Sequence, residues 1–243
     1  MTYFDDAKAL VEHAANEIPK LEHAYNDSLQ QQSIQPALLI EIKNLMENLR
    51  SALDFAAHGL FDKYGSSTRS NPKIYFPYAN LNQTKAQFQA SNRIEICIPG
   101  ISASRPDIVA QLESYQHFSN ADNRWLPLFM DLNNENKHER LTPQTREEAR
   151  QLTLKSDDGS YISLGEGSSI SMAPGSSLRI GDMVIPGGQD ISSKRPARYA
   201  GKGTQTVTIW VSFKFQSNGE LVIPFLKKAV KETQGIINDL AAV

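Results

Sequence analysis

The chain has 243 residues, of which 40% are hydrophobic and 21% are charged, and its formal net charge is −2. This length is ample for a hydrophobic core, and the composition is that of an ordinary globular protein, which argues against wholesale disorder. A net charge so close to zero gives no global argument for a nucleic-acid or membrane partner, although a local basic patch remains compatible with it.

Cysteine, histidine and apolar residues narrow the class of protein further. The single cysteine, Cys97, excludes an internal disulfide and a cysteine-based zinc site. No two of the five histidines are three to five residues apart, so no local metal-binding pair is present and no metal or cofactor is expected. The acidic start MTYFDDAKAL lacks the apolar run of a signal peptide, and no stretch approaches the ~20 apolar residues of a membrane helix. We therefore expect a cytoplasmic protein without a membrane partner.

Glycine and charge divide the chain near Arg150. Only three of the 14 glycines precede residue 151, and the net charge changes from −4 over residues 1–150 to +2 over residues 151–243. Because glycine disfavours helices, the first part can be helical and the second mostly cannot. We expect an α+β protein with a helical bundle over 1–150, a small Gly/Ser-rich antiparallel β unit over 151–223, and a C-terminal helix over 224–243 that docks back on the bundle.

Helical periodicity is strongest at the start of the chain. Apolar residues from Phe4 to Tyr25 recur at steps of three and four, and a second stripe predicts a helix from about Gln35 to Tyr64. Residues 66–104 are expected to be mostly irregular, with a short strand over 93–98. Further helices are predicted from Pro106 and from about Asn123.

The second half changes to the period of two residues that strands require. Residues 159–182 contain three eight-residue units, GSYISLGE, GSSISMAP and GSSLRIGD, which predict very short strands joined by Gly-Ser turns. The alternation of apolar and polar residues over 206–215 predicts a strand with one apolar face. Residues 221–223 are expected to form a second strand that pairs with it across a turn. Residues 190–205 are expected to form a long loop.

Known catalytic motifs are missing, and polar residues concentrate in two helices. The P-loop, serine-hydrolase elbow and GxGxxG patterns all fail to match. Arg50, Asp54 and His58 lie along one flank of the second helix, and Asn136 continues the apolar stripe of the helix that ends in NNENKHER. One interpretation is that Arg50, Asp54, Asn136 and His138 surround a catalytic cleft, in which His138 moves a proton and Arg50 or Lys137 holds a phosphate. The other is that Arg50–Asp54 is a surface ion pair and that Asn136 and His138 are structural.

These segments carry a resemblance to a protein family. LRSALDFAAHGL, IYFPY, LESYQHF and WLPLFMDLNNENKHERL resemble a bacterial group of helical proteins that combine an LRxALD helix with an NxxKHxxL segment, and this group resembles the HEPN helical domains. The resemblance covers roughly Leu38–Leu141. It implies a helical bundle, a homodimer, and a role in toxin or phage-defence systems. It also implies a protein that binds RNA or acts on it, which would be a metal-independent ribonuclease if it is an enzyme. HEPN ribonucleases place an arginine four to six residues before the histidine, and Asn133 stands at that position here.

A basic segment in the second half offers a second candidate surface. Lys194, Arg195, Arg198 and Lys202 surround Tyr199, a combination that could hold a phosphate backbone and stack one base, or could simply be a solvated loop. A different class of function also remains open, in which the chain is a non-catalytic scaffold and the β unit binds a partner protein.

Overall fold

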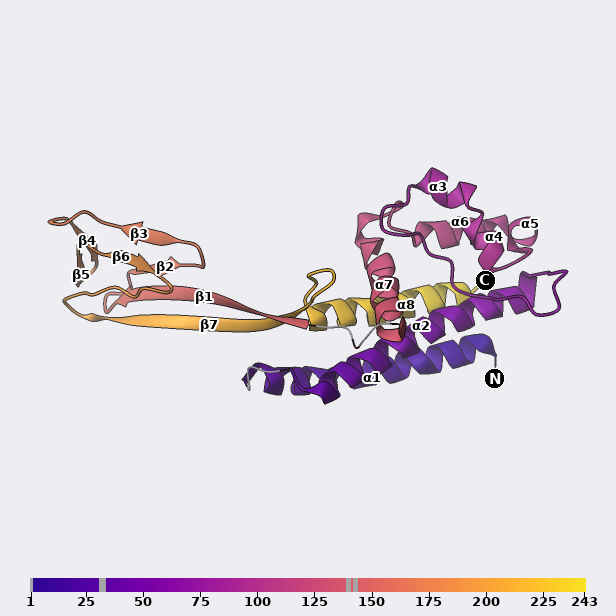
Figure 1. The fold of residues 1–243 in the computed structure, drawn as a ribbon, viewed down its shortest axis with the longest axis horizontal. Coiled ribbons are helices and arrows are strands. Elements are labelled where there is room, and N and C mark those ends of the chain that lie inside the picture. The colour runs from indigo at the N-terminus through magenta and orange to yellow at the C-terminus, as the bar shows by residue number, and fades with distance from the viewer. Residues whose placement is uncertain (1, 31–33, 139–140, 142–143) are drawn as a thin grey trace. The chain divides into compact units, whose positions relative to one another are not determined.

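The computed structural model describes residues 2–30, 34–138, 141 and 144–243. These residues form eight α-helices and small antiparallel sheets, so the predicted α+β class is correct. The chain divides into two compact units (Figure 1): Met1–Thr145 together with Lys214–Val243, called here the helical unit, and Arg146–Phe213, called the β unit. None of the described helices combines the length and the apolar character that crossing a membrane requires.

Three long helices build the core of the helical unit. They are α1 (Tyr3–Gln30), α2 (Pro36–Tyr64) and α8 (Val222–Ala241), and each packs against the other two. Every residue of the predicted stripe from Phe4 to Tyr25 is buried, as is the predicted apolar face of α8. The periodic spacing of apolar residues therefore places these helices correctly, and α1 continues through Pro19 without interruption.

Shorter helices follow α2. They are α3 (Lys85–Ala90), α4 (Arg93–Cys97), α5 (Ile101–Ser104), α6 (Pro106–Ser114), the 3-10 helix η1 (Ala121–Arg124) and α7 (Trp125–His138). The strand expected over 93–98 is wrong. Ile94 and Ile98 are buried but Ile96 is 60% exposed. That pattern belongs to a helical turn, in which residues four apart share a face and the residue between them does not.

In the part of the chain that the structure describes, the β unit combines two strands of 13 residues with five much shorter ones. Strand β1 (Gln144–Ser156) lies between β2 (Tyr161–Leu164) and β7 (Gly203–Phe215), and two separate ladders pair β3 (Ser169–Ser171) with β6 (Asp190–Ser192) and β4 (Ser177–Ile180) with β5 (Met183–Pro186). The three repeat units supply β2, β3 and β4, as predicted. Their apolar residues pack into one core together with buried residues of β1, β5 and β6.

Several expectations for the second half are wrong. The boundary near Arg150 falls inside β1, a strand that the sequence did not lead us to expect. Residues 190–205 are not one long loop, because they contain β6 and the start of β7. Residues 221–223 do not form a strand: Leu221 makes one isolated bridge to Lys214, and α8 begins at the next residue. Ile209 is 48% exposed, so the apolar face of β7 is only partly covered.

Candidate functional site

Arg50 connects α2 to α7. Its Nη1 donates a hydrogen bond to Oδ1 of Asn134 at 2.7 Å, in a partly buried position. The sequence interpretation required Arg50 to lie beside the polar end of the later helix, and this contact places it there. Its partner is Asn134, a residue that the sequence did not single out.

Asp54 and His58 face other neighbours than Arg50 does. Oδ1 of Asp54 accepts the backbone N–H of Phe76 at 2.9 Å, so this carboxylate holds the extended segment 73–78 against α2. The ring of His58 stacks on Tyr3 of α1, with 5.3 Å between ring centroids. The three residues of one helix flank therefore contact three different elements.

The remaining candidates of the first site lie at the end of α7. Asn136, Lys137 and His138 form its last residues, and their side chains lie outside the part of the structure that is described. Their roles stay predictions. Asn133, where the HEPN resemblance leads one to expect an arginine, is fully buried, and its Nδ2 donates to the carbonyl of Phe129 at 2.9 Å. A buried amide bonded to its own helix is a structural group, so Asn133 does not substitute for that arginine.

A cavity of about 200 Å³ opens beside Arg50 and is called here the arginine cavity. Its lining is formed by Arg50, Asp54, Tyr75, Phe76, Tyr78, Arg93 and Met130. Arg93 of α4 lies over the ring of Tyr78 at 5.8 Å from the ring centroid, close enough for a cation–π contact. Two arginines face one carboxylate, which already accepts a backbone N–H. The cavity therefore favours an anion.

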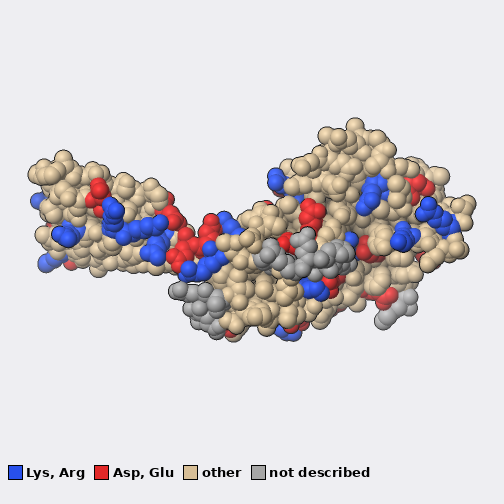
Figure 2. Space-filling view, in the orientation of Figure 1, with Lys and Arg blue, Asp and Glu red and all other residues tan. Residues whose placement is uncertain are grey.

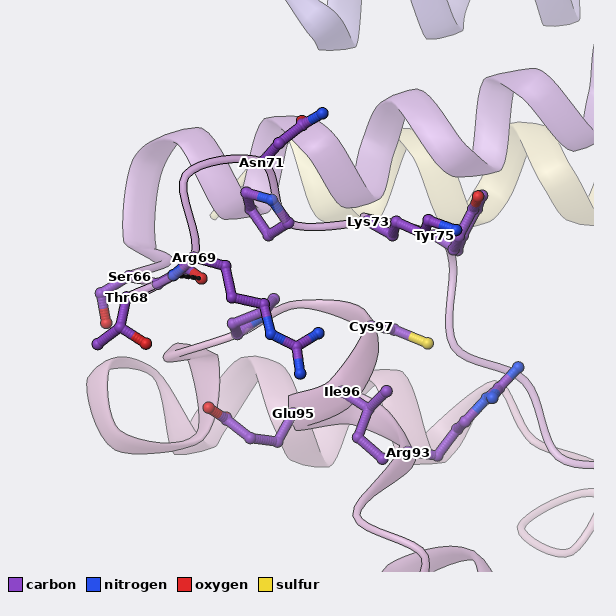
Figure 3. A pocket seen from close by; sticks show the side chains of 13 residues that line it. Ser66, Thr68, Arg69, Asn71, Lys73, Tyr75, Arg93, Glu95, Ile96 and Cys97 are labelled. Atoms are coloured by element: carbon purple, nitrogen blue, oxygen red, sulfur yellow. Dashed lines mark hydrogen bonds between the residues drawn. The ribbon is translucent and has the colours of Figure 1, made fainter.

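A larger cavity of about 810 Å³ adjoins it and is called here the loop cavity, because the loop over residues 66–75 forms one wall and α4 the other (Figure 3). Tyr75 and Arg93 line both cavities. Neither residue stands out in the sequence as a candidate. IYFPY was quoted only as part of a resemblance, and Arg93 was placed in a strand that does not exist, so nothing in the linear pattern indicated that they meet.

The basic segment of the β unit is exposed, and two of its four cations have an acidic neighbour. Lys194, Arg195, Arg198 and Lys202 are all exposed, but Lys194 pairs with Glu166 at 3.9 Å and Arg195 with Asp190 at 3.8 Å. Tyr199 was the candidate for base stacking. Its ring instead packs against the core of the β unit, and its hydroxyl donates to the carbonyl of Gly203 at 3.1 Å.

Charge in the β unit is mixed. Residues 146–213 carry eight basic and seven acidic side chains, and Figure 2 shows the two signs close together on the visible face of this unit. A nucleic-acid surface normally concentrates one sign. The arginine cavity is therefore the better candidate for anion binding, and the solvated-loop interpretation suits the basic segment.

Comparison with family models, with curated proteins and with solved structures gave no match. Within the described ranges, no group of three or more histidine, cysteine, aspartate or glutamate side chains is placed to hold a metal ion.

Proposed function

We propose that this chain is an RNA-directed protein with an HEPN-like helical unit, and that the arginine cavity binds the RNA backbone. The observation that carries the proposal is the convergence of Arg50 and Arg93 with Tyr75 and Tyr78 around one small cavity. Arginine binds phosphate oxygens through its planar fork of N–H donors, and tyrosine rings stack on unpaired bases. A single strand requires cations beside an exposed ring, and Tyr75, which is 49% exposed, provides that ring.

Cleavage would depend on His138, which follows Asn134 by one helical turn in α7. A histidine at neutral pH can take a proton from a ribose hydroxyl and return it to the leaving oxygen, while Arg50 neutralises the phosphate. These roles are proposed from the residue types in the sequence and from the position of His138 in α7. The alternative is that the protein binds RNA without cutting it, or that it is a scaffold that binds none.

Binding is tested first, with fluorescence anisotropy on a single-stranded oligoribonucleotide at several salt concentrations. Arg50→Gln and Arg93→Gln should each weaken binding about tenfold and lower the salt slope by about one, because each removes one phosphate contact. Lys8→Gln, an exposed lysine of α1, is the matched control and should leave both quantities unchanged. Equal affinity and slope in all four proteins would remove the arginine cavity from the proposal.

Cleavage is tested on the same preparations with His138→Ala. If His138 is the general acid or base, the rate should fall about 10²–10⁴-fold while the melting temperature stays within a degree or two of the wild type. A wild-type protein that cuts no RNA, together with a variant that only melts earlier, would reject the ribonuclease role. Binding data would then decide between an RNA-binding protein and a scaffold.

A further inference from the structure

The loop cavity is enclosed by a loop that is fixed at both ends. The backbone N–H of Ser66 donates to the carbonyl of Pro99 at 2.9 Å, and that of Tyr75 donates to the carbonyl of Cys97 at 3.4 Å. Gly100 permits the first closure, because it has φ of 84° and a Cβ there would lie 2.5 Å from Ser66 N. The wall of the cavity is thus held in place by backbone hydrogen bonds at both ends of the loop.

The charges that line this cavity are unbalanced. Arg69, Lys73 and Arg93 contribute three cations, and none of them forms an ion pair with a carboxylate among the described residues. Figure 3 shows the Arg69 side chain extending from the loop towards α4, whereas Asn71 points away from it. Glu95 is the one acidic residue of the lining, which leaves an excess of two positive charges.

Glu95 forms no ion pair with these three cations, because its carboxylate is already hydrogen-bonded to backbone N–H groups. Its Oε1 accepts Gly100 N at 2.6 Å and its Oε2 accepts Ser102 N at 3.2 Å. Burial acts to raise the pKa of Glu95, but these hydrogen bonds outweigh it and hold the pKa below its ordinary value. The carboxylate therefore stays ionised. Its oxygens face the turn between α4 and α5, where the backbone supplies their hydrogen-bond donors.

The thiol in the lining is not an activated nucleophile. Cys97 is buried, and burial raises its pKa above the ordinary value, although the nearby Arg93 partly opposes that shift. A protonated thiol is a poor nucleophile at neutral pH. What the cavity offers a ligand is positive charge, plus the ring of Tyr75, which is 49% exposed.

We propose that the loop cavity binds the phosphomonoester of a nucleotide whose base lies against Tyr75. A terminal phosphate carries about −1.5 to −2 charges near pH 7, which matches the excess of two, whereas an internal phosphodiester carries only about −1. Because Tyr75 and Arg93 also line the arginine cavity, the nucleotide is the phosphorylated end of the strand that contacts Arg50. In this last respect the inference rests on the proposed function.

The test compares hexamers of adenylate that carry a 5′-phosphate, a 3′-phosphate or only hydroxyl ends, with the dye on the opposite end. The wild type should bind one phosphorylated hexamer about tenfold more tightly than the hydroxyl form, and the double variant Arg69→Gln/Lys73→Gln should lose that preference. The control is the double variant Lys8→Gln/Lys231→Gln, which removes two exposed lysines away from both cavities. It should keep the preference for the phosphorylated hexamer. Circular dichroism of each variant checks that the helical unit is intact.

Adenosine monophosphate, measured by isothermal titration calorimetry, separates this inference from the proposed function. Binding of the mononucleotide that depends on Arg69 and Lys73, without binding of any hexamer, would support the cavity and reject the RNA strand. The opposite result is a hexamer affinity that depends on Arg50 and is the same with and without the end phosphate and the double substitution. That result would support RNA binding at the arginine cavity and overturn phosphate binding in the loop cavity. Failure of every ligand would reject both.

Discussion

Gln116 shows how one buried amide positions the site. Its Oε1 accepts Ala79 N at 2.8 Å, and its Nε2 donates to the carbonyls of Pro77 at 3.2 Å and Leu112 at 2.9 Å. It thereby fixes the extended segment that carries Tyr75 and Tyr78. Gln116→Ala should lower the free energy of unfolding by about 2–3 kcal/mol, since it leaves buried backbone groups unpaired. Urea denaturation measures this loss of stability.

The control is Gln89→Ala, which removes an exposed contact to Glu113 and should cost less than about 0.5 kcal/mol. An equal loss of stability in the two variants would contradict the role of Gln116 in fixing the segment.

Glu95 should make stability depend on pH. Its folded pKa is lowered, so its contribution is present above the unfolded value of about 4.3 and is lost as pH falls through the folded value. Glu95→Gln should therefore cost about 1–2 kcal/mol at pH 7, where charge-assisted hydrogen bonds are lost, and progressively less below pH 4. Urea titrations of both proteins at pH 7, 5 and 3 measure the difference. A difference that stays constant with pH would show that the charge of Glu95 is irrelevant.

The turn before β7 depends on Gly201. Gly201 has φ of 94°, and a Cβ there would lie 2.0 Å from the carbonyl oxygen of Asp182. The neighbouring bridge between Val184 and Ala200 leaves that carbonyl little room to move. Gly201→Ala should destabilise the β unit by more than about 2 kcal/mol. Gly159→Ala is the control, because its φ of 90° is similar and nothing lies within 4 Å of its Cβ. It should cost only about 1 kcal/mol, and thermal unfolding of both variants compares them.

Elements with a long, regular pattern could be predicted, and those with a short one could not. The stripes of α1, α2 and α8 span several turns, so periodicity alone places them. The segment Arg93–Cys97 is one turn long, and in so short a run the alternation of a strand and the spacing of a helix look alike. The first half of β1 is mostly charged or polar, and its only buried apolar residues are Leu152 and Leu154 near its end. The alternation of apolar and polar residues that would predict a strand is therefore weak.

The candidate site was predictable only in part for a related reason. Arg50 stood out because it interrupts an apolar helix, and its contact with α7 follows from the packing of two predicted helices. Arg69, Lys73 and Arg93 lie in a loop and a short helix. They share a cavity because hydrogen bonds at Ser66 and Tyr75 fold the loop over α4, and long-range backbone contacts of this kind leave no periodic signal in the sequence.

Each unit has a core of its own, and this determines how the chain should unfold. The β unit buries Leu152, Met183 and Ile185 completely, and α2 of the helical unit buries Leu53 in the same way. Truncation of such residues costs about 2–5 kcal/mol. If each core stabilises only its own unit, Ile185→Ala should speed amide exchange over residues 146–213 alone, and Leu53→Ala should speed it over the helical unit alone.

Hydrogen exchange followed by mass spectrometry reads both units in one experiment on the full chain, with RNA binding measured beside it. Ile185→Ala should leave the affinity for an oligoribonucleotide within about twofold of the wild type, because every residue of the arginine and loop cavities belongs to the helical unit. Faster exchange across both units in either variant would show one cooperative structure. Loss of RNA binding in Ile185→Ala without any change in the exchange of the helical unit would place the RNA contact on the β unit, and the basic segment from Lys194 to Lys202 would then replace the arginine cavity as the candidate site.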